Sequence, residues 1–374
     1  MKSAYAGTFT FTKIAEADNK NFIGVGVGGI NDNGTVVFAA DTPSVIGTGL
    51  FTGNGEAISQ VIKPSRLNGF NGAEINNSGT IGFGKILPKD GLFISNGKTV
   101  ITVATPSDGL SVGQVVSNAF NNNNTLVFTL NTFDNPVIAT SSGGSFTTVV
   151  DTSGQFSFFD QPPVINDNNV VAFSAVSKKD VSQGLYTIQN GLVTTIADAD
   201  ETSPFLGGFF DFSINNRNAV GFTATLKSGE EGVFIGNGKT ITTVANTSGT
   251  FSEFFDLRIN NNNQIAFNGI LDNGTPNVFA DGIFTGSDPI ADKVIGIGDS
   301  LFGGTVTNVF FAGGLNNLGQ IAFMATIKDS NNISRDFIFR ADPVSTSVPE
   351  STSILGLLAL GTLGTGLTLK SNLK

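Results

Sequence analysis

The chain has 374 residues, a formal net charge of −10 and a pI near 4.5, and 13% of its residues are charged. This acidic balance argues against nucleic-acid binding, because phosphate contacts need a basic surface. It also argues against attraction to an anionic lipid surface. The sequence has no cysteine, histidine or tryptophan, which excludes disulfides, thiolate or histidine metal ligands, a histidine general base and Trp-Asp propeller repeats.

The first expected element is a β-strand over residues 9–18, where Phe and Thr alternate much as they do in residues 146–151. Just before it, residues 4–6 read Ala-Tyr-Ala, the small-x-small form of a signal-peptidase site, although no apolar segment precedes them. One hypothesis is that the start codon is assigned too late, so that an export signal lies upstream of Met1.

From residue 30 onward one sequence motif recurs seven times: an apolar residue, an Asn, a short turn and a strand that ends in Phe. Successive copies of this Phe are separated by 45, 45, 45, 49, 45 and 56 residues. A period of this size, with strands and no room for a crossover helix, is typical of a β-propeller. The seven residues are Phe38, Phe83, Phe128, Phe173, Phe222, Phe267 and Phe323.

Each repeat reads as four strands. In the fifth, strands are expected over residues 209–214, 219–224, 232–235 and 240–245. Asn237-Gly238 joins the last two, and Asn-Gly between strand-like runs predicts a type I′ hairpin and therefore antiparallel neighbours. The first strands of several repeats combine Gly with Phe, which predicts close backbone approach around the central axis.

The final repeat has only three strands, near residues 306–311, 320–327 and 336–340. The strand at residues 9–18 supplies the missing fourth, which would close the ring and hide its edges. The sequence therefore predicts an all-β fold: a seven-bladed β-propeller of four-stranded antiparallel blades over residues 7–341, with the N-terminal strand closing the last blade. The alternative is a linear array of β-hairpin modules without closure.

The composition changes after the last repeat. Residues 342–353 form a polar linker, and residues 354–369 carry no charge before Lys370 and Lys374. A helix of 16 residues spans about 24 Å, slightly less than the ~30 Å hydrocarbon core of a membrane, and flanking lysines relieve the shortfall. We therefore expect a C-terminal hydrophobic helix over residues 354–374 that reaches the membrane.

This C-terminal region resembles the PEP-CTERM sorting signal of exported bacterial proteins, cyanobacterial ones in particular. Val348, Pro349 and Glu350 precede the Gly- and Leu-rich span, with Ser351 in place of the second proline of the family motif. The resemblance implies export, recognition by exosortase-type sorting machinery and delivery to the cell surface or extracellular matrix. An ordinary membrane tail anchor is the alternative.

The repeat also resembles a family. Residues 315–323, Leu-Asn-Asn-Leu-Gly-Gln-Ile-Ala-Phe, are similar to the extracellular HAF-type repeat, whose core is Ile-Asn-x-x-Gly-x-Val followed by a small residue. The likeness covers most of residues 22–341. It implies a structural repeat and brings no catalytic residues.

Three carboxylates are the candidate site residues. Asp160, Asp211 and Asp256 each follow a Phe in the first strand of three consecutive repeats, so they would meet near the axis, on the face opposite the Asn-rich turns. Variable loops on that face add Asp151, Asp198, Asp200 and Glu201. The cluster predicts a cation or ligand site. The alternative is that each Asp caps backbone N–H groups.

The Asn-rich turns offer a second, weaker calcium hypothesis, because Asx side chains supply oxygen ligands. The competing interpretation is that Asn is used there for its left-handed conformation and its Asx turns.

The expected function is a non-catalytic binding or structural protein of the cell surface or matrix, a monomeric ring with polysaccharide as a candidate partner. Before processing, its C-terminal helix would anchor it in the membrane. No cofactor is expected, with calcium as a candidate ion. The alternative is a carboxylate-dependent glycan hydrolase or lyase, since carboxylate pairs cleave glycosidic bonds without histidine.

Overall fold

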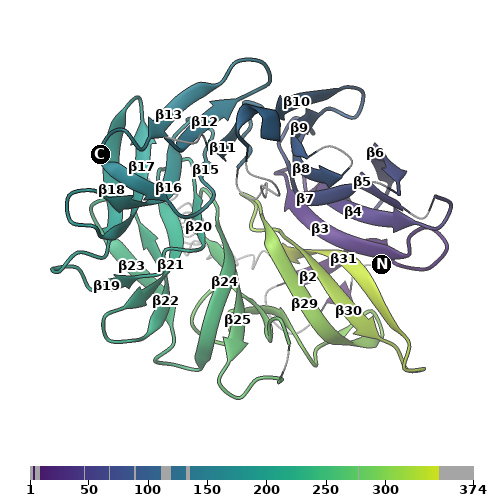
Figure 1. Ribbon diagram of the computed structural model, residues 1–374. Coiled ribbons are helices and arrows are strands. Elements are labelled where there is room, and N and C mark those ends of the chain that lie inside the picture. The colour runs from purple at the N-terminus through teal and green to yellow at the C-terminus, as the bar shows by residue number, and fades with distance from the viewer. Residues whose placement is uncertain are drawn as a thin grey trace, which may run out of the picture. The chain divides into compact units, whose positions relative to one another are not determined.

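The computed structural model describes residues 3–4, 9–45, 47–66, 68–87, 90–110, 119–131, 135–276 and 278–344. The chain divides into two compact units, Met1–Pro343 and Val344–Lys374. Within the first unit, seven antiparallel sheets follow one another around a centre (Figure 1). They are numbered here as blades 1 to 7 in chain order, and the fold is a seven-bladed β-propeller.

Blades 1 to 3 come from the first part of the chain. Their strands run from the inside of the ring to its rim. The strands are β3 (Gly24–Ile30), β4 (Val36–Thr42), β5 (Gly47–Gly53) and β6 (Ile58–Ser65) in blade 1; β7 (Gly69–Ile75), β8 (Ile81–Leu87), β9 (Gly91–Ser95) and β10 (Val100–Ala104) in blade 2; and β11 (Leu126–Leu130), β12 (Val137–Ser141) and β13 (Thr147–Asp151) in blade 3.

Two short features complete this part. A 3-10 turn, η1 (Pro106–Asp108), follows blade 2. Residues 111–118, where the inner strand of blade 3 is expected, lie outside the described residues.

Blades 4 to 7 follow the same plan, except that two inner strands are split. The strands are β14 (Phe156–Phe159), β15 (Val164–Ile165), β16 (Val171–Ser177), β17 (Gln183–Gln189) and β18 (Leu192–Asp198) in blade 4; β19 (Phe205–Gly207), β20 (Phe212–Ile214), β21 (Val220–Leu226), β22 (Glu231–Gly236) and β23 (Ile241–Asn246) in blade 5; β24 (Phe251–Ile259), β25 (Ile265–Leu271), β26 (Gly282–Phe284) and β27 (Lys293–Gly296) in blade 6; and β28 (Ser300–Leu301), β29 (Gly304–Leu315), β30 (Ile321–Lys328) and β31 (Ser334–Pro343) in blade 7.

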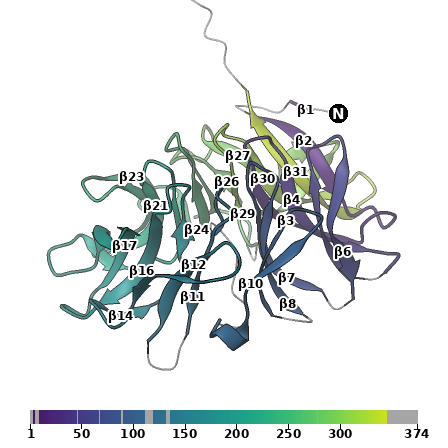
Figure 2. The same cartoon turned by 90° about the horizontal axis from the view of Figure 1, so that it is seen from above.

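The N-terminal strand closes the ring, as the sequence predicts. The outer strand of blade 7 is β2 (Phe9–Glu16), which pairs antiparallel with β31 and carries β1 (Ser3–Ala4) on its far side. Lys13 faces Phe339 in the register, and Glu16 faces Phe337. A linear array without closure is therefore excluded. In Figure 2 the inner strands β3, β24 and β29 lie between the outer strands β6 and β23.

Each blade is built on the repeated Phe. All seven copies are buried, from 0% to 2% exposed. In six blades this Phe sits directly opposite an aromatic residue on the third strand, such as Phe51 opposite Phe38, with ring centroids 5.8 Å apart. In blade 3 the opposite residue is Ala139, and Phe146 contacts Phe128 instead, at 5.6 Å. Such pairs contribute beyond the area that they bury.

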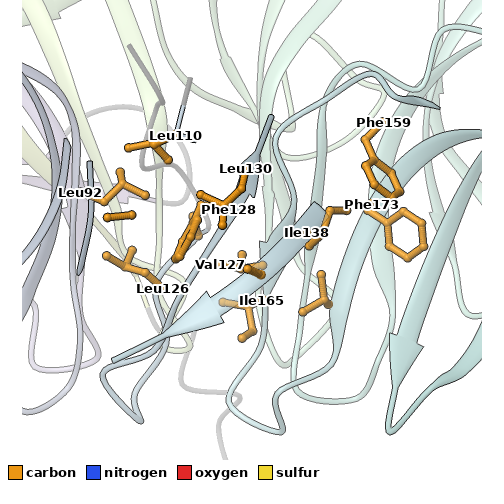
Figure 3. Packing of buried hydrophobic residues seen from close by; sticks show 14 of the residues in the cluster. Leu92, Leu110, Leu126, Val127, Phe128, Leu130, Ile138, Phe159, Ile165 and Phe173 are labelled. Carbon is orange, nitrogen blue, oxygen red and sulfur yellow. The ribbon is translucent and has the colours of Figure 1, made fainter. Parts of the chain in front are cut away.

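Packing between blades is continuous. One buried cluster joins Leu92 of blade 2, Phe128 and Ile138 of blade 3, and Ile165 and Phe173 of blade 4 (Figure 3). Six such clusters among the described residues together cover every contact between neighbouring blades, as radial packing requires.

A ring of asparagines joins the blades near the axis. The Asn that starts each first turn donates Nδ2–H to the backbone carbonyl of the same Asn in the next blade, at 2.8–3.4 Å, and the seventh returns to the first. These residues are Asn31, Asn76, Asn121, Asn166, Asn215, Asn260 and Asn316.

A second ring runs beside the first. The backbone N–H that follows each of these asparagines donates to Oδ1 of the corresponding residue in the next blade, at 2.7–2.9 Å. Fourteen repeated hydrogen bonds thus close the ring at the end where the first turns lie.

The same asparagines also shape their own turns. Oδ1 of Asn31 accepts the N–H groups of Asn33 and Thr35, which makes an Asx turn. The third residue after each of these asparagines is a Gly or another Asn, and its φ lies between +57° and +80°. The conformational role predicted for Asn is therefore confirmed. Calcium binding at these turns stays a prediction that would require these hydrogen bonds to break.

Glycine serves close approach near the axis. A Cβ on Gly28 would lie 2.6 Å from the carbonyl oxygen of Ala73, and one on Gly29 would lie 2.2 Å from Oε2 of Glu74. Both distances are shorter than real Cβ contacts, so these positions of β3 accept only glycine without rearrangement.

The C-terminal expectations concern residues beyond the propeller. β31 includes Asp342 and Pro343. The sorting motif at Val348, Pro349 and Glu350, and the segment with Lys370 and Lys374, lie outside the described residues. Among the residues that are described, no helix is long and apolar enough to cross a membrane.

Removing residues 1–16 should destabilise the propeller, because it exposes the edge of β31 and the face on which Phe11 packs against Phe323. We expect a lower melting temperature and a tendency to aggregate in size-exclusion chromatography. A synthetic peptide of residues 9–17, added in trans, should restore part of the loss by strand addition. Equal melting of the truncated and full-length chains would contradict closure by β2.

Replacing Asn215 by Asp separates the two roles of the ring asparagine. The carboxylate keeps the acceptor for the N–H groups of Arg217 and Ala219, but it loses the donor to the Asn260 carbonyl. We expect a loss of about 3 kcal/mol in the free energy of unfolding, because a buried acceptor then faces a carbonyl. Denaturant unfolding measures it.

The matched control is Asn237→Asp. Asn237 caps an exposed hairpin through Lys239 and Thr240 and makes no bond between blades. This substitution should lower the free energy of unfolding by less than about 0.5 kcal/mol. Equal costs for the two substitutions would show that the bonds between blades contribute nothing.

Candidate functional site

The inner strands share a break at one level. Register shifts interrupt the pairing of β3, β7, β24 and β29 shortly before the turn Asn, and in blades 4 and 5 the inner strand is split there. A bulge leaves a residue unpaired and redirects its side chain. Asp211 lies in the gap between β19 and β20, and Asp256 occupies the bulge of β24 with φ +52°.

These two carboxyls line one cavity of about 230 Å³. Blade 4 contributes Gln161, Pro162 and Val164, and blade 7 contributes Ala312 and Gly313. The remaining lining residues are Phe210, Asp211, Phe212, Asp256 and Leu257 of blades 5 and 6. The cavity therefore gathers four consecutive blades at the level of the inner-strand break, and its lining combines polar and apolar surface.

The two carboxyls interact directly. The backbone N–H of Asp256 donates a hydrogen bond to the Asp211 carboxylate, which limits the rise that burial causes in the pKa of Asp211. Burial, and then the charge of Asp211, raise the pKa of Asp256 to about 6. Nδ2 of Asn268 donates to Oδ2 of Asp256 at 3.1 Å and opposes this rise. Near neutral pH the pair therefore gains or loses one proton easily.

Asp160 does not join this pair. Nε2 of Gln183 donates to its Oδ2, while its Oδ1 is buried and has no partner among the described residues, and Asp160 does not line the cavity. The reason is visible in the sequence. Asp211 and Asp256 stand four residues before their turn Asn, whereas Asp160 stands six residues before Asn166. Pro162 takes the equivalent position in blade 4, so the expected three-carboxylate cluster is a pair.

Two of the other four acidic loop residues have local roles. Asp151 accepts hydrogen bonds from Ser153, and Asp200 accepts them from Thr202 and Ser203. Burial and the charge of Asp200 raise the pKa of Asp198. For Asp151 and Asp200, therefore, the structure favours the capping alternative over a ligand site.

An ion pair crosses the central channel of the ring, beside the cavity. Arg258 of blade 6 donates through NH2 to Oε1 of Glu74 of blade 2 and through Nε to the carbonyl of Gly313. Both side chains are largely buried, 12% and 10% exposed. The pair also lines the polar end of the channel where the asparagine rings lie. It therefore stands between those rings and the carboxyl cavity.

Sequence reasoning missed this pair, although a signal exists. Glu74 and Arg258 each stand two residues before a turn Asn, and the same position is Gly29 in blade 1 and Gly314 in blade 7. Glu74 lies against Gly29 of blade 1, whereas Arg258 lies against Gly313 of blade 7, one residue before Gly314. Opposite charges at this position in two blades, with glycine at the same position in the blades between them, indicate a contact across the axis.

The aromatic residues that line the cavity are Phe210 and Phe212, and Phe210 is 62% exposed. A separate aromatic row lies on blades 6 and 7, where the Phe279 ring packs edge-on against Phe255 with centroids 4.7 Å apart and lies 5.2 Å from the Phe310 ring.

The side chains at the cavity can contact an organic ligand. Among the described residues, no group of three or more His, Cys, Asp or Glu side chains is placed to hold a metal ion. Two carboxyls, one amide and apolar walls can bind an organic ligand that donates hydrogen bonds. The same carboxyl pair could also exchange protons with a bound substrate.

Comparison with known proteins adds little about function. A model of a family of unknown function (DUF7453) matches residues 197–346, a stretch that contains Asp211 and Asp256 but not Asp160. No curated protein matches the sequence.

Two solved structures are similar to this chain. One is described as YCF48 bound to D1 peptide, with 10% identity, 91% of this chain and 98% of that chain covered, and a TM-score of 0.46. The other is prolyl oligopeptidase B from Galerina marginata as apo protein, with 10% identity, 82% of this chain and 47% of that chain covered, and a TM-score of 0.45. Neither likeness assigns a function. The sheet topology itself defines a seven-bladed propeller, a fold consistent with a non-catalytic binding or structural role.

Replacing Asp256 by Asn should stabilise the protein at neutral pH. The folded-state pKa of about 6 lies above the ordinary value of 3.8, so ionisation favours the unfolded chain as pH rises from about 4 to 6. The variant removes this penalty and should gain about 1–3 kcal/mol in unfolding free energy at pH 7. The gain should be small at pH 4, close to the unfolded-state value of 3.8, and it should disappear at lower pH, where both states are protonated. Asn also tolerates the left-handed backbone.

Urea unfolding at pH 4 and pH 7 measures the effect. The control is Asp272→Asn, which removes an exposed carboxylate outside the cavity. Equal stability of wild type and Asp256→Asn at pH 7 would show that Asp256 ionises in the folded protein without cost.

Proposed function

We propose that the protein is an exported, non-catalytic binding propeller of the cell surface or extracellular matrix, and that it holds a polysaccharide at the Asp211–Asp256 cavity. The observation that carries the binding role is this cavity, which two carboxyls, the Gln161 side chain and the exposed Phe210 line together. A few polar groups on an apolar wall are the usual composition of a ligand site.

Export rests on the sequence alone. The resemblance to the PEP-CTERM signal at Val348, Pro349 and Glu350, with Lys370 and Lys374 at the end, supports passage through exosortase-type machinery. In this proposal the C-terminal segment anchors the chain in the membrane until it is processed. The ring then acts as a monomer, because β2 closes its last blade.

One observation also favours a second function. Asp211 and Asp256 share one cavity, and the pKa of Asp256 is raised to about 6, so one carboxyl can hold a proton while the other is ionised. Glycosidic bonds are cleaved by such pairs. A glycan hydrolase or lyase is therefore the alternative that the test must separate from binding.

A glycan array with the purified full-length chain tests the proposal. We expect binding to a subset of polysaccharides, with no release of reducing ends over hours. The double variant Asp211→Asn/Asp256→Asn and the single variant Phe210→Ala should each bind at least about tenfold more weakly, because each removes a direct contact.

Asp160→Asn is the matched control, since Asp160 lies outside the cavity, and it should bind like the wild type. Turnover that disappears in the double variant would establish the enzyme instead. Binding that survives in both cavity variants would place the ligand elsewhere on the ring.

A further inference from the structure

The cavity carries negative charge without a counter-ion. The five ion pairs found among the described residues involve neither Asp211 nor Asp256. No Lys or Arg lines the cavity. Arg258, two residues beyond Asp256, is turned to Glu74 and Gly313 instead. Burying carboxylates without a cation is costly, so such a pair indicates a group that arrives from outside.

A second observation concerns hydrogen bonding. Asn268 is 0% exposed, and its Nδ2 donates to Oδ2 of Asp256 and to the carbonyl of Phe311, at 3.1 Å each. Its Oδ1 is buried and accepts no hydrogen bond from the described residues. Asn268 supports Asp256 from behind and does not line the cavity; among the side chains that do, Asp211 and Asp256 offer carboxyl acceptors and Gln161 is the one with N–H donors. An incoming group that brings several N–H donors would satisfy these acceptors.

The apolar part of the cavity limits the shape of that group. Phe210, Phe212, Leu257, Pro162 and Val164 surround the polar centre. The exposed Phe210 ring can pack against the C–H face of a sugar, and aromatic faces also attract ammonium groups. Gln161 adds a neutral amide, which can both donate to and accept from a hydroxyl.

We propose that the cavity binds a sugar unit with a free amine, within an amino-sugar polysaccharide. Its ammonium group lies between the Asp211 and Asp256 carboxylates, its hydroxyls reach Gln161, and its C–H face lies on Phe210. The inference rests on the proposed function and names the ligand class for the same site. The net charge of −10 favours the approach of such a cationic polymer.

Isothermal titration of the full-length chain with two matched probes tests it. One probe is a fully deacetylated β-1,4-glucosamine tetramer, and the other is the same tetramer with every amine acetylated. At pH 6.5 and low salt we expect the deacetylated tetramer to bind at least about tenfold more tightly, because acetylation removes both the charge and the donors. Binding should weaken as salt is raised.

Three variants locate the interaction. Asp211→Asn and Asp256→Asn should each reduce the affinity for the deacetylated tetramer at least about tenfold, and Asp160→Asn should leave it unchanged. Thermal unfolding confirms that each variant is folded. Equal losses in all three variants would overturn the placement of the amine in this cavity.

The remaining outcomes separate this inference from the proposed function. Equal binding of the acetylated tetramer would overturn the amine and leave a glycan-binding protein. Binding of a lysine tetrapeptide as tight as that of the deacetylated tetramer would overturn the sugar. If neither tetramer binds, but another polysaccharide binds and loses affinity in Phe210→Ala, the inference is wrong and the proposed function stands. If no glycan binds at all, both fail.

Discussion

The propeller depends on one side-chain group, the carboxamide of the asparagine at the first turn of each blade. An amide has a donor end and an acceptor end, and this position uses both. In blade 5, Oδ1 of Asn215 accepts two N–H groups of its own turn, while Nδ2 donates to the carbonyl of Asn260 in the next blade. Aspartate, serine or glutamine would satisfy only part of this arrangement. The same residue therefore forms the turn and sets the spacing between blades.

Because of this constraint, the two ends of each inner strand differ in how far their residues can vary between blades. At the turn end, the two rings of hydrogen bonds fix the backbone of all seven blades. A few residues earlier each described inner strand is bulged or split, and the side chain there differs from blade to blade. The carboxyl cavity lies at this variable level. A rigid frame at one end thus allows two carboxyls to be held together at the other, at a cost in stability near neutral pH.

The sequence predicts the fold well because the fold is periodic. Seven copies of one sequence motif, Asn-Gly hairpins and an incomplete last repeat are enough to fix the number of blades and the partner of β2. The asparagines could be placed in turns from their local preferences. Their bonds to the next blade could not, because a turn contains no information about its neighbour in space.

The candidate site was only partly predictable for a related reason. Asp211 and Asp256 meet because both keep the same spacing to the turn Asn, and counting that spacing would have set Asp160 apart. The contact between Arg258 and Glu74 joins blades that are far apart in sequence, and only the glycines between them hint at it. The exposure of Phe210 depends on the bulge, which the pattern of Gly and Phe does not define.

Closure by β2 has a consequence for the kinetics of folding. The first long strand of the propeller pairs with its last one, and Thr10 meets Asp342 across 332 residues of chain. Contacts between such distant segments form slowly. Until they form, β31 presents an unpaired edge with Phe337, Phe339 and Ala341 along it, and such edges recruit other chains. The protein is therefore most prone to self-association between the synthesis of β31 and the docking of β2 onto its edge.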